Sequence, residues 1–275
     1  MLHLSSVREK MTRNLRKWPL IFLILSVSVN ANATVLYVRY SSDQIIIATD
    51  SKRTAETGQT VCVCKIAQIG DTFIASAGLA EFGEFDPKEF AREAINTSRT
   101  LIETRARFEE LINDNLIDVL QRIKKKNPDR YEVFKQGAAV NMVFARFKEQ
   151  PELVTTALIP KDGPNGSIVL TTQHFTLIGQ NKTKRIFVGI SKRVEVVLDR
   201  PSFWAKGVIA GVHRAMQISI EDKRDAGEPI DIVQLTKGSV RWYPREPQCD
   251  ARSRRINDQP PTCNSSNGTR QPQTH

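Results

Sequence analysis

Residues 31–50 read Ala-Asn-Ala-Thr-Val-Leu-Tyr-Val-Arg-Tyr-Ser-Ser-Asp-Gln-Ile-Ile-Ile-Ala-Thr-Asp, and this stretch predicts two features of the chain. The Ala31-x-Ala33 motif is typical of the end of a secretory signal peptide, so we expect the mature chain to begin at Thr34. Two short β-rich runs follow, and the second ends on Asp50. A threonine with a free α-amine is a nucleophile that carries its own base, because the amine can accept the hydroxyl proton.

Residues 1–33 have the three parts of a signal peptide. A basic stretch from Arg8 to Trp18 precedes the apolar stretch Pro19–Val29, and the cleavage motif follows. The apolar stretch is shorter than the ~20 residues that a membrane-spanning helix needs. We therefore expect cleavage after Ala33 and an exported protein, periplasmic or secreted, without a stable membrane anchor. An uncleaved signal anchor is the alternative.

The composition indicates a globular protein with one large domain. The chain has 275 residues, of which 40% are hydrophobic and 25% are charged, and these are ordinary values for globular proteins. The formal net charge is +10 at pH 7, and part of this excess lies in the leader and in an arginine-rich tail. Basic and aromatic residues do not alternate along the sequence as a nucleic-acid-binding face requires, so we expect no nucleic-acid partner.

We divide the chain into a cleaved signal peptide (1–33), one folded domain (34–243) and a polar tail (244–275). The tail is rich in proline, arginine, asparagine, glutamine and serine, and this composition predicts disorder.

The four cysteines fall into two pairs. Cys62 and Cys64 would face the same side of a strand, and we expect them to be buried apolar residues. Their spacing is too short for a zinc knuckle, and the histidines cannot complete a site, so we expect no metal and no cofactor. Cys249 and Cys263 lie in the tail, where an exported protein is expected to form a disulfide.

The hydrophobic pattern predicts strands, a helix pair, strands, a helix and then strands. The expected strands are 35–40, 45–50, 61–69, 72–77, 138–147, 152–159, 167–172, 175–178, 185–190, 194–198, 230–236 and 239–242. The expected helices are a pair over 87–126, with a break near 96–98 or at Arg105, and one helix over 201–223. This order suits the α+β class and a four-layer α/β/β/α sandwich, in which two sheets pack together and helices cover both outer faces.

The pattern resembles the N-terminal nucleophile hydrolases, and within them proteasome β-subunits and the related bacterial peptidases of the HslV type. In that family a mature N-terminal threonine, here Thr34, opens the first strand, and an aspartate closes the second in an apolar-Ala-x-Asp-Ser/Gly context, here 47–51. The family's strand lysine corresponds to Lys65, and its oxyanion-hole glycine to Gly78. Its later aspartate, in an Arg-Asp-Ala motif, corresponds to Asp225.

The sequence departs from the family in its serines. The family has a serine near the active threonine in a Gly-Ser-Gly turn, and Ser191 is the counterpart here, although a strand-like run follows it. The second family serine is missing from 227–229. These differences in the serines bear on how efficiently the chain can hydrolyse a peptide bond, and they bear less on its fold.

The resemblance implies a threonine-type peptidase or amidohydrolase that acts on a peptide or another amide, as a homo-oligomer or ring. Thr34 Oγ1 would attack the carbonyl carbon while its own amine accepts the proton. A cationic Lys65, oriented by Asp50, would lower the pKa of both groups. The backbone N–H of Gly78 would stabilise the oxyanion. Asp225 and Ser191 are the remaining implied site residues.

Two other functions fit the same residues. A non-catalytic exported subunit of the same fold, used for binding or assembly, would keep an extension in front of Thr34. An amidase for small amides or acyl-amino compounds would use the same nucleophile and would not cleave peptides. Each of Thr34, Asp50 and Lys65 taken singly could be a structural residue, and it is their joint spacing that favours a site.

Overall fold

The structure is a computed structural model that describes residues 34–54, 60–79, 82–83, 85–189, 192–222 and 226–243, without the side chains of 53–54 and 60–62. Its strands are β1 (Leu36–Tyr40), β2 (Gln44–Asp50), β3 (Lys52–Thr54), β4 (Thr60–Cys62), β5 (Ile66–Ile69), β6 (Thr72–Gly78), β7 (Val140–Phe147), β8 (Pro151–Asp162), β9 (Ile168–Ile178), β10 (Lys184–Val188), β11 (Ile230–Thr236) and β12 (Ser239–Tyr243). Its α-helices are α1 (Pro87–Thr97), α2 (Leu101–Lys126), α3 (Pro128–Gln136), α4 (Lys192–Val197) and α5 (Val208–Glu221).

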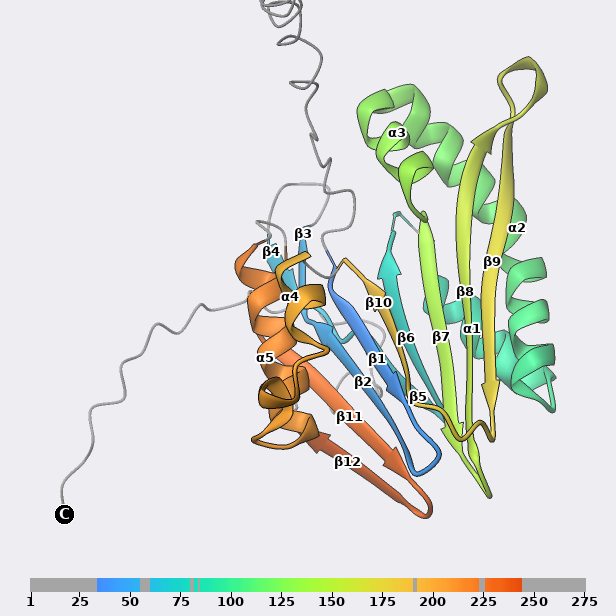
Figure 1. Cartoon of the computed structure of the whole chain (residues 1–275). Helices are drawn as coiled ribbons and strands as arrows, with labels where there is room; N and C mark the ends of the chain where they lie inside the picture. The colour runs from blue at the N-terminus through green and yellow to red at the C-terminus, as the bar shows by residue number, and fades with distance from the viewer. Residues whose placement is uncertain are drawn as a thin grey trace, which may run out of the picture.

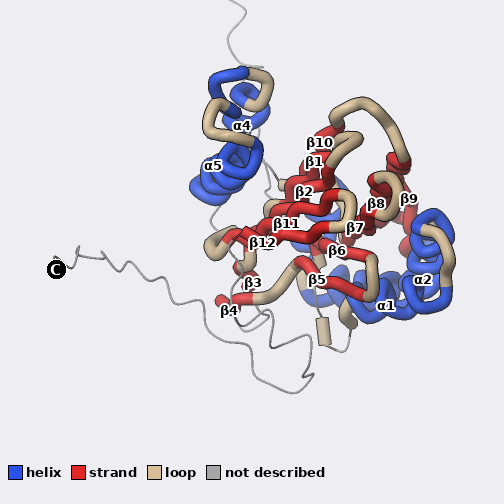
Figure 2. The backbone as a smooth tube through the Cα atoms, turned by 90° about the horizontal axis from the view of Figure 1, so that it is seen from below, coloured by secondary structure: helices blue, strands red, loops and turns tan. Residues whose placement is uncertain are grey.

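Within these ranges the strands form two five-stranded antiparallel sheets, with the orders β10-β1-β2-β11-β12 and β5-β6-β7-β8-β9, and a separate β3–β4 pair. The two sheets lie side by side (Figures 1 and 2). Helices α1 and α2 lie on the outer side of the sheet that contains β5–β9, and α4 and α5 lie on the outer side of the sheet that contains β1 and β2. The predicted α+β class is confirmed, and the arrangement is compatible with a sandwich.

The central strand β2 supplies apolar side chains to both of its faces. Ile45 and Ile47 pack between the two sheets, against residues such as Phe73 of β6. Ile46, between them in sequence, packs instead with Met216 of α5. All three isoleucines are fully buried, as the continuous apolar run predicts. Side chains in a strand alternate between faces, so this register fixes which way every neighbouring residue points.

The helix pair forms because its break and its caps are encoded locally. Helix α1 ends at Thr97, and the side chain of Thr100 caps α2 together with Glu103 in a capping box. The break therefore lies near the first of the two predicted positions. Helix α3 was not expected, and it starts at Pro128 after Asn127 caps its first turn.

The expected strand at 194–198 is wrong, because the structure has helix α4 there. The β-branched valines favoured a strand on propensity alone. In a strand Val194, Val196 and Leu198 would share one face, yet Val194 and Leu198 are buried and Val196 is 64% exposed. Residues four apart share a helix face, and packing of that face beside α5 overrides the strand preference.

Other element boundaries also differ from the prediction. The expected strands at 167–172 and 175–178 form one strand, β9. The expected strand at 61–69 is divided into β4 and β5 by residues 63–65. The expected helix at 201–223 is a 3-10 turn followed by α5, because Gly207, with a φ of 96°, separates them.

Tyr40, at the end of β1, ties the two sheets together. Its hydroxyl group donates a hydrogen bond to the carbonyl oxygen of Pro151 at 3.1 Å and accepts one from the N–H of Gln180 at 2.9 Å. Pro151 begins β8, and Gln180 lies in the connection from β9 to β10. One side chain thus joins a central strand of the first sheet to the second sheet and to the chain that passes between them.

We expect Tyr37 to make the folding free energy depend on pH in alkali. Its ring is fully buried, and its hydroxyl group has no hydrogen-bond partner among the described residues. Burial raises the pKa of Tyr37 from 10.0 to about 12. The folded chain then holds a proton that the unfolded chain loses, so this stabilising contribution is complete below pH 10 and is lost as the pH rises towards 12.

Urea unfolding of the parent protein and of Tyr37→Phe at several pH values between 8 and 11 tests this. At neutral pH, Tyr37→Phe should be as stable as the parent or more stable, because it removes a buried hydroxyl group without a partner. Its stability should fall less steeply above pH 10. Tyr243→Phe, at the partly exposed end of β12, should keep the steeper decline of the parent. Equal slopes for the parent and Tyr37→Phe would contradict the assignment.

Two glycines with positive φ should respond very differently to alanine. Gly78 has a φ of 100°, and a Cβ there would overlap the carbonyl oxygen of Ala139. Gly70 has a φ of 60° and open space around the same position. Gly70→Ala should lower the free energy of unfolding by ~1–2 kcal/mol, because alanine disfavours the left-handed backbone conformation. Gly78→Ala should lower it by the same amount and by a further ~1–3 kcal/mol, because the new Cβ overpacks against Ala139. Chemical denaturation of both variants measures the difference, and equal losses would show that Ala139 moves aside.

Candidate functional site

The ammonium group of Lys65 is the centre of a buried polar cluster between the two sheets. Lys65 Nζ lies 3.2 Å from Thr34 Oγ1 and 2.9 Å from Asp50 Oδ1. It also donates to the carbonyl oxygen of Lys52 at 2.7 Å. The side chains of Thr34, Asp50 and Lys65 are all at most 5% exposed. The structure therefore brings together the predicted nucleophile, lysine and aspartate.

The β1–β2 hairpin accounts for the closeness of Thr34 and Asp50. Leu36 pairs with Thr49, so the start of β1 lies beside the end of β2. The N–H of Val35 donates to Asp50 Oδ1 at 2.7 Å, and the N–H of Asp50 donates to the carbonyl oxygen of Val35 at 3.2 Å. The antiparallel ladder thus fixes the aspartate next to the threonine, although fifteen residues separate them in sequence.

Lys65 reaches this point from the other sheet. It lies directly before β5, in the short segment 63–65 that separates β4 from β5. Its carbonyl oxygen accepts from the N–H of Ser76 in β6 at 3.4 Å, and the N–H of Val63 donates to the carbonyl oxygen of Ser51 at 2.8 Å. These backbone bonds hold both ends of the segment, so the lysine side chain is aimed across the space between the sheets.

Burial raises the pKa of Asp50, whereas the charge of Lys65 and hydrogen bonds from Lys65, Val35 and Gly227 act in the opposite direction. The ammonium group donates to the oxygen of the Thr34 hydroxyl, so the hydroxyl proton remains available for transfer to a base. A cation at this distance also stabilises negative charge as it develops on that oxygen. The arrangement can therefore lower the pKa of the Thr34 hydroxyl.

Gly78 lies at the end of β6, two residues beyond Ser76 and its hydrogen bond to Lys65. Its positive φ and its close approach to Ala139 leave no room for a side chain there. It thus lies on β6, the strand that is hydrogen-bonded to Lys65 through Ser76. Ser191 and Asp225, the other two predicted site residues, lie outside the described residues.

Three neighbours of the site were not predicted from the sequence. The N–H of Gly227 donates to Asp50 Oδ2 at 3.4 Å. Ser51 Oγ donates to Asp231 Oδ2 at 2.8 Å, and both side chains are buried. The sequence did contain one signal for Asp231, which interrupts the apolar run Ile-Asp-Ile-Val. A charged residue in a buried strand needs a polar partner, so this position indicates a buried polar contact. Gly227 carried no such signal, since a backbone donor can come from any residue.

The expectation that Cys64 is a buried apolar thiol is wrong. Cys64 is disulfide-bonded and only half-buried. The segment 63–65 is not a strand, so Cys64 does not point into a sheet face as the alternating pattern required. Its partner is not among the side chains that the structure describes, and Cys249 and Cys263 lie outside the described residues.

Within the described ranges, no three His, Cys, Asp or Glu side chains are grouped in a way that could hold a metal ion. In the same ranges, the helices are too short or too polar to cross a membrane.

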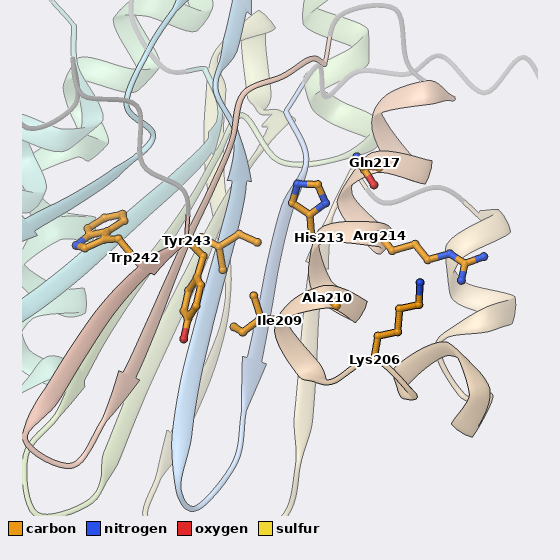
Figure 3. A pocket seen from close by; sticks show the side chains of 9 residues that line it. Lys206, Ile209, Ala210, His213, Arg214, Gln217, Trp242 and Tyr243 are labelled. Atoms are coloured by element: carbon orange, nitrogen blue, oxygen red, sulfur yellow. The ribbon is translucent and has the colours of Figure 1, made fainter. Parts of the chain in front are cut away.

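A hollow of about 1050 Å³ lies alongside α5, and its lining includes Lys206, His213 and Arg214 from the helix side and Trp242 and Tyr243 from β12 (Figure 3). Lys206 and Arg214 extend from the side of the helix that faces away from the two aromatic rings (Figure 3). The cationic and aromatic groups therefore do not converge on one point. The hollow contains none of the residues around Thr34.

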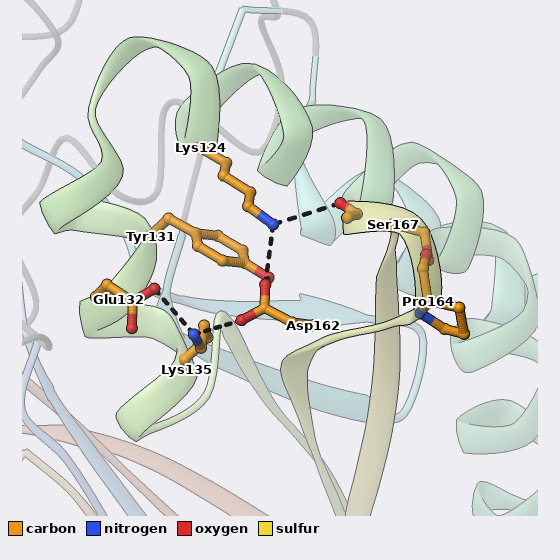
Figure 4. A network of polar contacts seen from close by, with 8 residues as sticks. Lys124, Tyr131, Glu132, Lys135, Asp162, Pro164 and Ser167 are labelled. Atoms are coloured by element: carbon orange, nitrogen blue, oxygen red, sulfur yellow. Dashed lines mark hydrogen bonds and ion pairs between the residues drawn. The ribbon is translucent and has the colours of Figure 1, made fainter.

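A second polar cluster lies at the tip of the β8–β9 hairpin (Figure 4). The carboxylate of Asp162 accepts from Lys135 at 2.5 Å, from Lys124 at 2.9 Å and from the Tyr131 hydroxyl at 3.2 Å. The hydrogen bonds from Lys135 and Lys124 hold the pKa of Asp162 well below its usual range. Tyr131 is buried while Asp162 is 44% exposed, and the cluster joins the hairpin to α2 and α3, so we assign it a structural role.

Neither a protein family model nor a curated protein matches this chain. Two solved structures of Anbu from Hyphomicrobium sp. strain MC1 are similar to it in part. The (Gly-1) mutant has a TM-score of 0.43 and 17% identity, with 76% of this chain and 87% of that chain covered. The other has a TM-score of 0.42 and 15% identity, with 76% and 86% covered. Similarity at this level carries no argument about function.

These comparisons correct the resemblance drawn from the sequence. The identification with the N-terminal nucleophile hydrolases of the proteasome β-subunit and HslV type is wrong, since no family model and no curated relative supports it. The matched positions were single residues at the ends of strands, together with two short motifs. What the structure itself supports is a mixed α+β fold with a buried Thr34–Lys65–Asp50 cluster.

Proposed function

We propose that this chain is an exported hydrolase that cleaves peptide or other amide bonds with the hydroxyl group of Thr34 as its nucleophile. The observation that carries the proposal is the buried contact of the Lys65 ammonium group with both Thr34 Oγ1 and Asp50. A buried ion pair adds little stability compared with apolar side chains of similar volume. A lysine held by an aspartate and directed at a hydroxyl group is, however, a recognised way to activate a nucleophile.

The proposed reaction uses groups at the start of the mature chain. Thr34 Oγ1 attacks the amide carbon, and the hydroxyl proton passes to the α-amine that cleavage after Ala33 sets free. The backbone N–H of Gly78 donates to the oxyanion, an interaction worth ~2.7–4 kcal/mol in other enzymes. The amine proton then passes to the leaving nitrogen, the C–N bond breaks, and water hydrolyses the acyl ester on Thr34. Asp225 and Ser191 stay in the proposal as predicted members of the same site.

The proposal includes the organisation of the chain. Residues 1–33 would be removed on export, 34–243 would form the catalytic domain, and 244–275 would be a polar tail. The Ala31-x-Ala33 motif supports export. A four-layer α/β/β/α sandwich is supported by three separate hydrophobic clusters, one between the sheets and one between each sheet and its helices.

We expect a threonine-directed β-lactone or epoxyketone to modify Thr34 of the exported protein. Intact mass and N-terminal sequencing should show a chain that starts at Thr34 and carries one adduct. Thr34→Ser keeps the hydroxyl group and should still react, whereas Thr34→Ala should not. Ala33→Asp blocks signal-peptide cleavage, because the site requires a small residue. The Ala33→Asp variant should fold normally. Its Thr34 should stay unmodified, since the α-amine of Thr34 would be bound in a peptide bond.

Two outcomes would count against the proposal. A mature chain that begins elsewhere, or an unmodified Thr34 at the N-terminus, would favour a non-catalytic binding protein.

If Thr34 is modified, a second assay separates a peptidase from a small-amide amidase. It measures the hydrolysis of a fluorogenic peptide and of a small N-acyl amino acid side by side.

We expect Lys65 and Asp50 to be coupled in stability and both to be needed for the reaction. Lys65→Met or Asp50→Asn each leaves one polar partner buried without its counterpart, at a cost of ~3–5 kcal/mol. The double variant should lose less than the sum of the two, because neither charge remains. Adduct formation at Thr34 should be lost in all three variants.

The matched control for these variants is Lys161→Met, a change of the same kind at an exposed lysine of β8. It should alter the free energy of unfolding by at most ~0.5 kcal/mol and leave adduct formation unchanged. Additive losses of stability would show that the two side chains do not interact. Full reactivity of Lys65→Met would remove the lysine from the proposed mechanism.

A further inference from the structure

Strand β9 is an edge of its sheet, and no other strand among the residues that the structure describes pairs with its outer side. It pairs with β8 residue for residue along its whole length, from Ile168 opposite Asp162 to Ile178 opposite Glu152. It ends the strand order of its sheet, and Figure 2 shows it at the side of the molecule. From 171 to 176 every side chain is exposed, on both faces of the strand. The outer backbone groups of this stretch therefore face solvent.

The sequence of this edge lacks the usual protection against pairing. Residues 171–176 read Thr-Thr-Gln-His-Phe-Thr, with no lysine, arginine, aspartate, glutamate or proline. Phe175 is 63% exposed, and Val169 on the same side of the strand is 47% exposed. Natural edge strands are commonly kept short, charged, bulged or covered, because an open edge is a template for another strand.

The other edges of the two five-stranded sheets are protected in these ways. Strand β5 has only four residues. Strand β10 has five residues and carries Lys184 and Arg185, and β12 has five residues and carries Arg241. Strand β9, with eleven residues, is longer than all three, and unlike β10 and β12 it carries no charged residue. The difference singles out β9 as the place where a further strand fits.

We propose that the occupant is β9 of a second copy of this chain, paired antiparallel about a two-fold axis at Gln173. Residues opposite each other in an antiparallel pair share a face, so a symmetric pair must be centred on a residue. Centring on Gln173 places Gln173 opposite itself and Thr171 opposite Phe175 on one face. On the other face it places Thr172 opposite His174.

This pairing is self-complementary in chemistry as well as in symmetry. A β-branched residue opposite an aromatic one is a favourable cross-strand pair, and two glutamine side chains can exchange amide hydrogen bonds. No pair of permanent like charges meets, which matters because two copies of a chain with more basic than acidic residues repel each other over most surfaces. The two five-stranded sheets then become one continuous sheet across the dimer.

The test is the molar mass of the full mature chain, measured by light scattering over a wide range of concentration. The wild type should be a dimer that dissociates on dilution. Phe175→Lys puts a charge on the paired edge and should be monomeric. Val240→Lys is the matched control, because Val240 is 47% exposed on β12, an edge strand of the other five-stranded sheet, and this variant should remain dimeric. Both sites are exposed, so folding should be unaffected.

A second measurement tests the register without relying on those variants. Gln173→Cys should form a disulfide between two copies under mild oxidation, because the residue faces itself across the axis. Thr171→Cys alone should not cross-link, but it should do so when mixed with Phe175→Cys. Peptide mapping identifies the linked residues.

A wild type that is monomeric at every concentration would overturn the proposal. So would a Phe175→Lys dimer, or loss of the dimer in Val240→Lys, which would move the interface to β12. Cross-linking of Thr171→Cys to itself would exclude the register centred on Gln173. None of these readouts depends on activity at Thr34, so the dimer and the proposed function can fail separately.

Discussion

The ion pair between Lys65 and Asp50 is the interaction on which the candidate site depends. Asp50 belongs to one sheet, and Lys65 lies at the start of a strand in the other. Each charge would be costly in the core without its counterpart, so both sheets must be in place before either side chain is satisfied. Assembly of the sandwich and assembly of the cluster around Thr34 are therefore one event.

The hydrophobic pattern of β2 is what makes that pairing reproducible. Ile45 and Ile47 face the second sheet while Ile46 faces α5, so a slip of one residue would exchange the two faces. The same slip would carry Asp50 away from Val35 and Lys65. The large apolar interface between the two sheets thus keeps the small polar cluster of Thr34, Asp50 and Lys65 in register. The polar groups could not fix that register alone, since their net contribution to folding is small.

Much of this arrangement follows from the sequence, because it is local. The hairpin that brings Thr34 to Asp50, the helix break near Thr97 and the run of buried isoleucines are all visible in short windows. Contacts between residues that are far apart in sequence cannot be seen in such windows. Gly227 reaches Asp50 through a backbone N–H, and Asp231 reaches Ser51 from a strand far away in sequence. Helix α4 was missed because packing beside α5 outweighed the preference of its valines for strand. The family resemblance failed for a related reason, since it rested on residue types at strand ends.

The two ends of β1 are linked to the second sheet in different ways, so the two ends of the sandwich differ in chemistry. At one end Tyr40 joins the sheets through neutral hydrogen bonds to Pro151 and Gln180. At the other end the sheets meet through the charged contact of Lys65 with Thr34 and Asp50. A change in the charge of that contact would loosen one end and leave the other fastened. The sheets would then be held less tightly at the Thr34 end of β1 than at the Tyr40 end, while the apolar core between them stays packed.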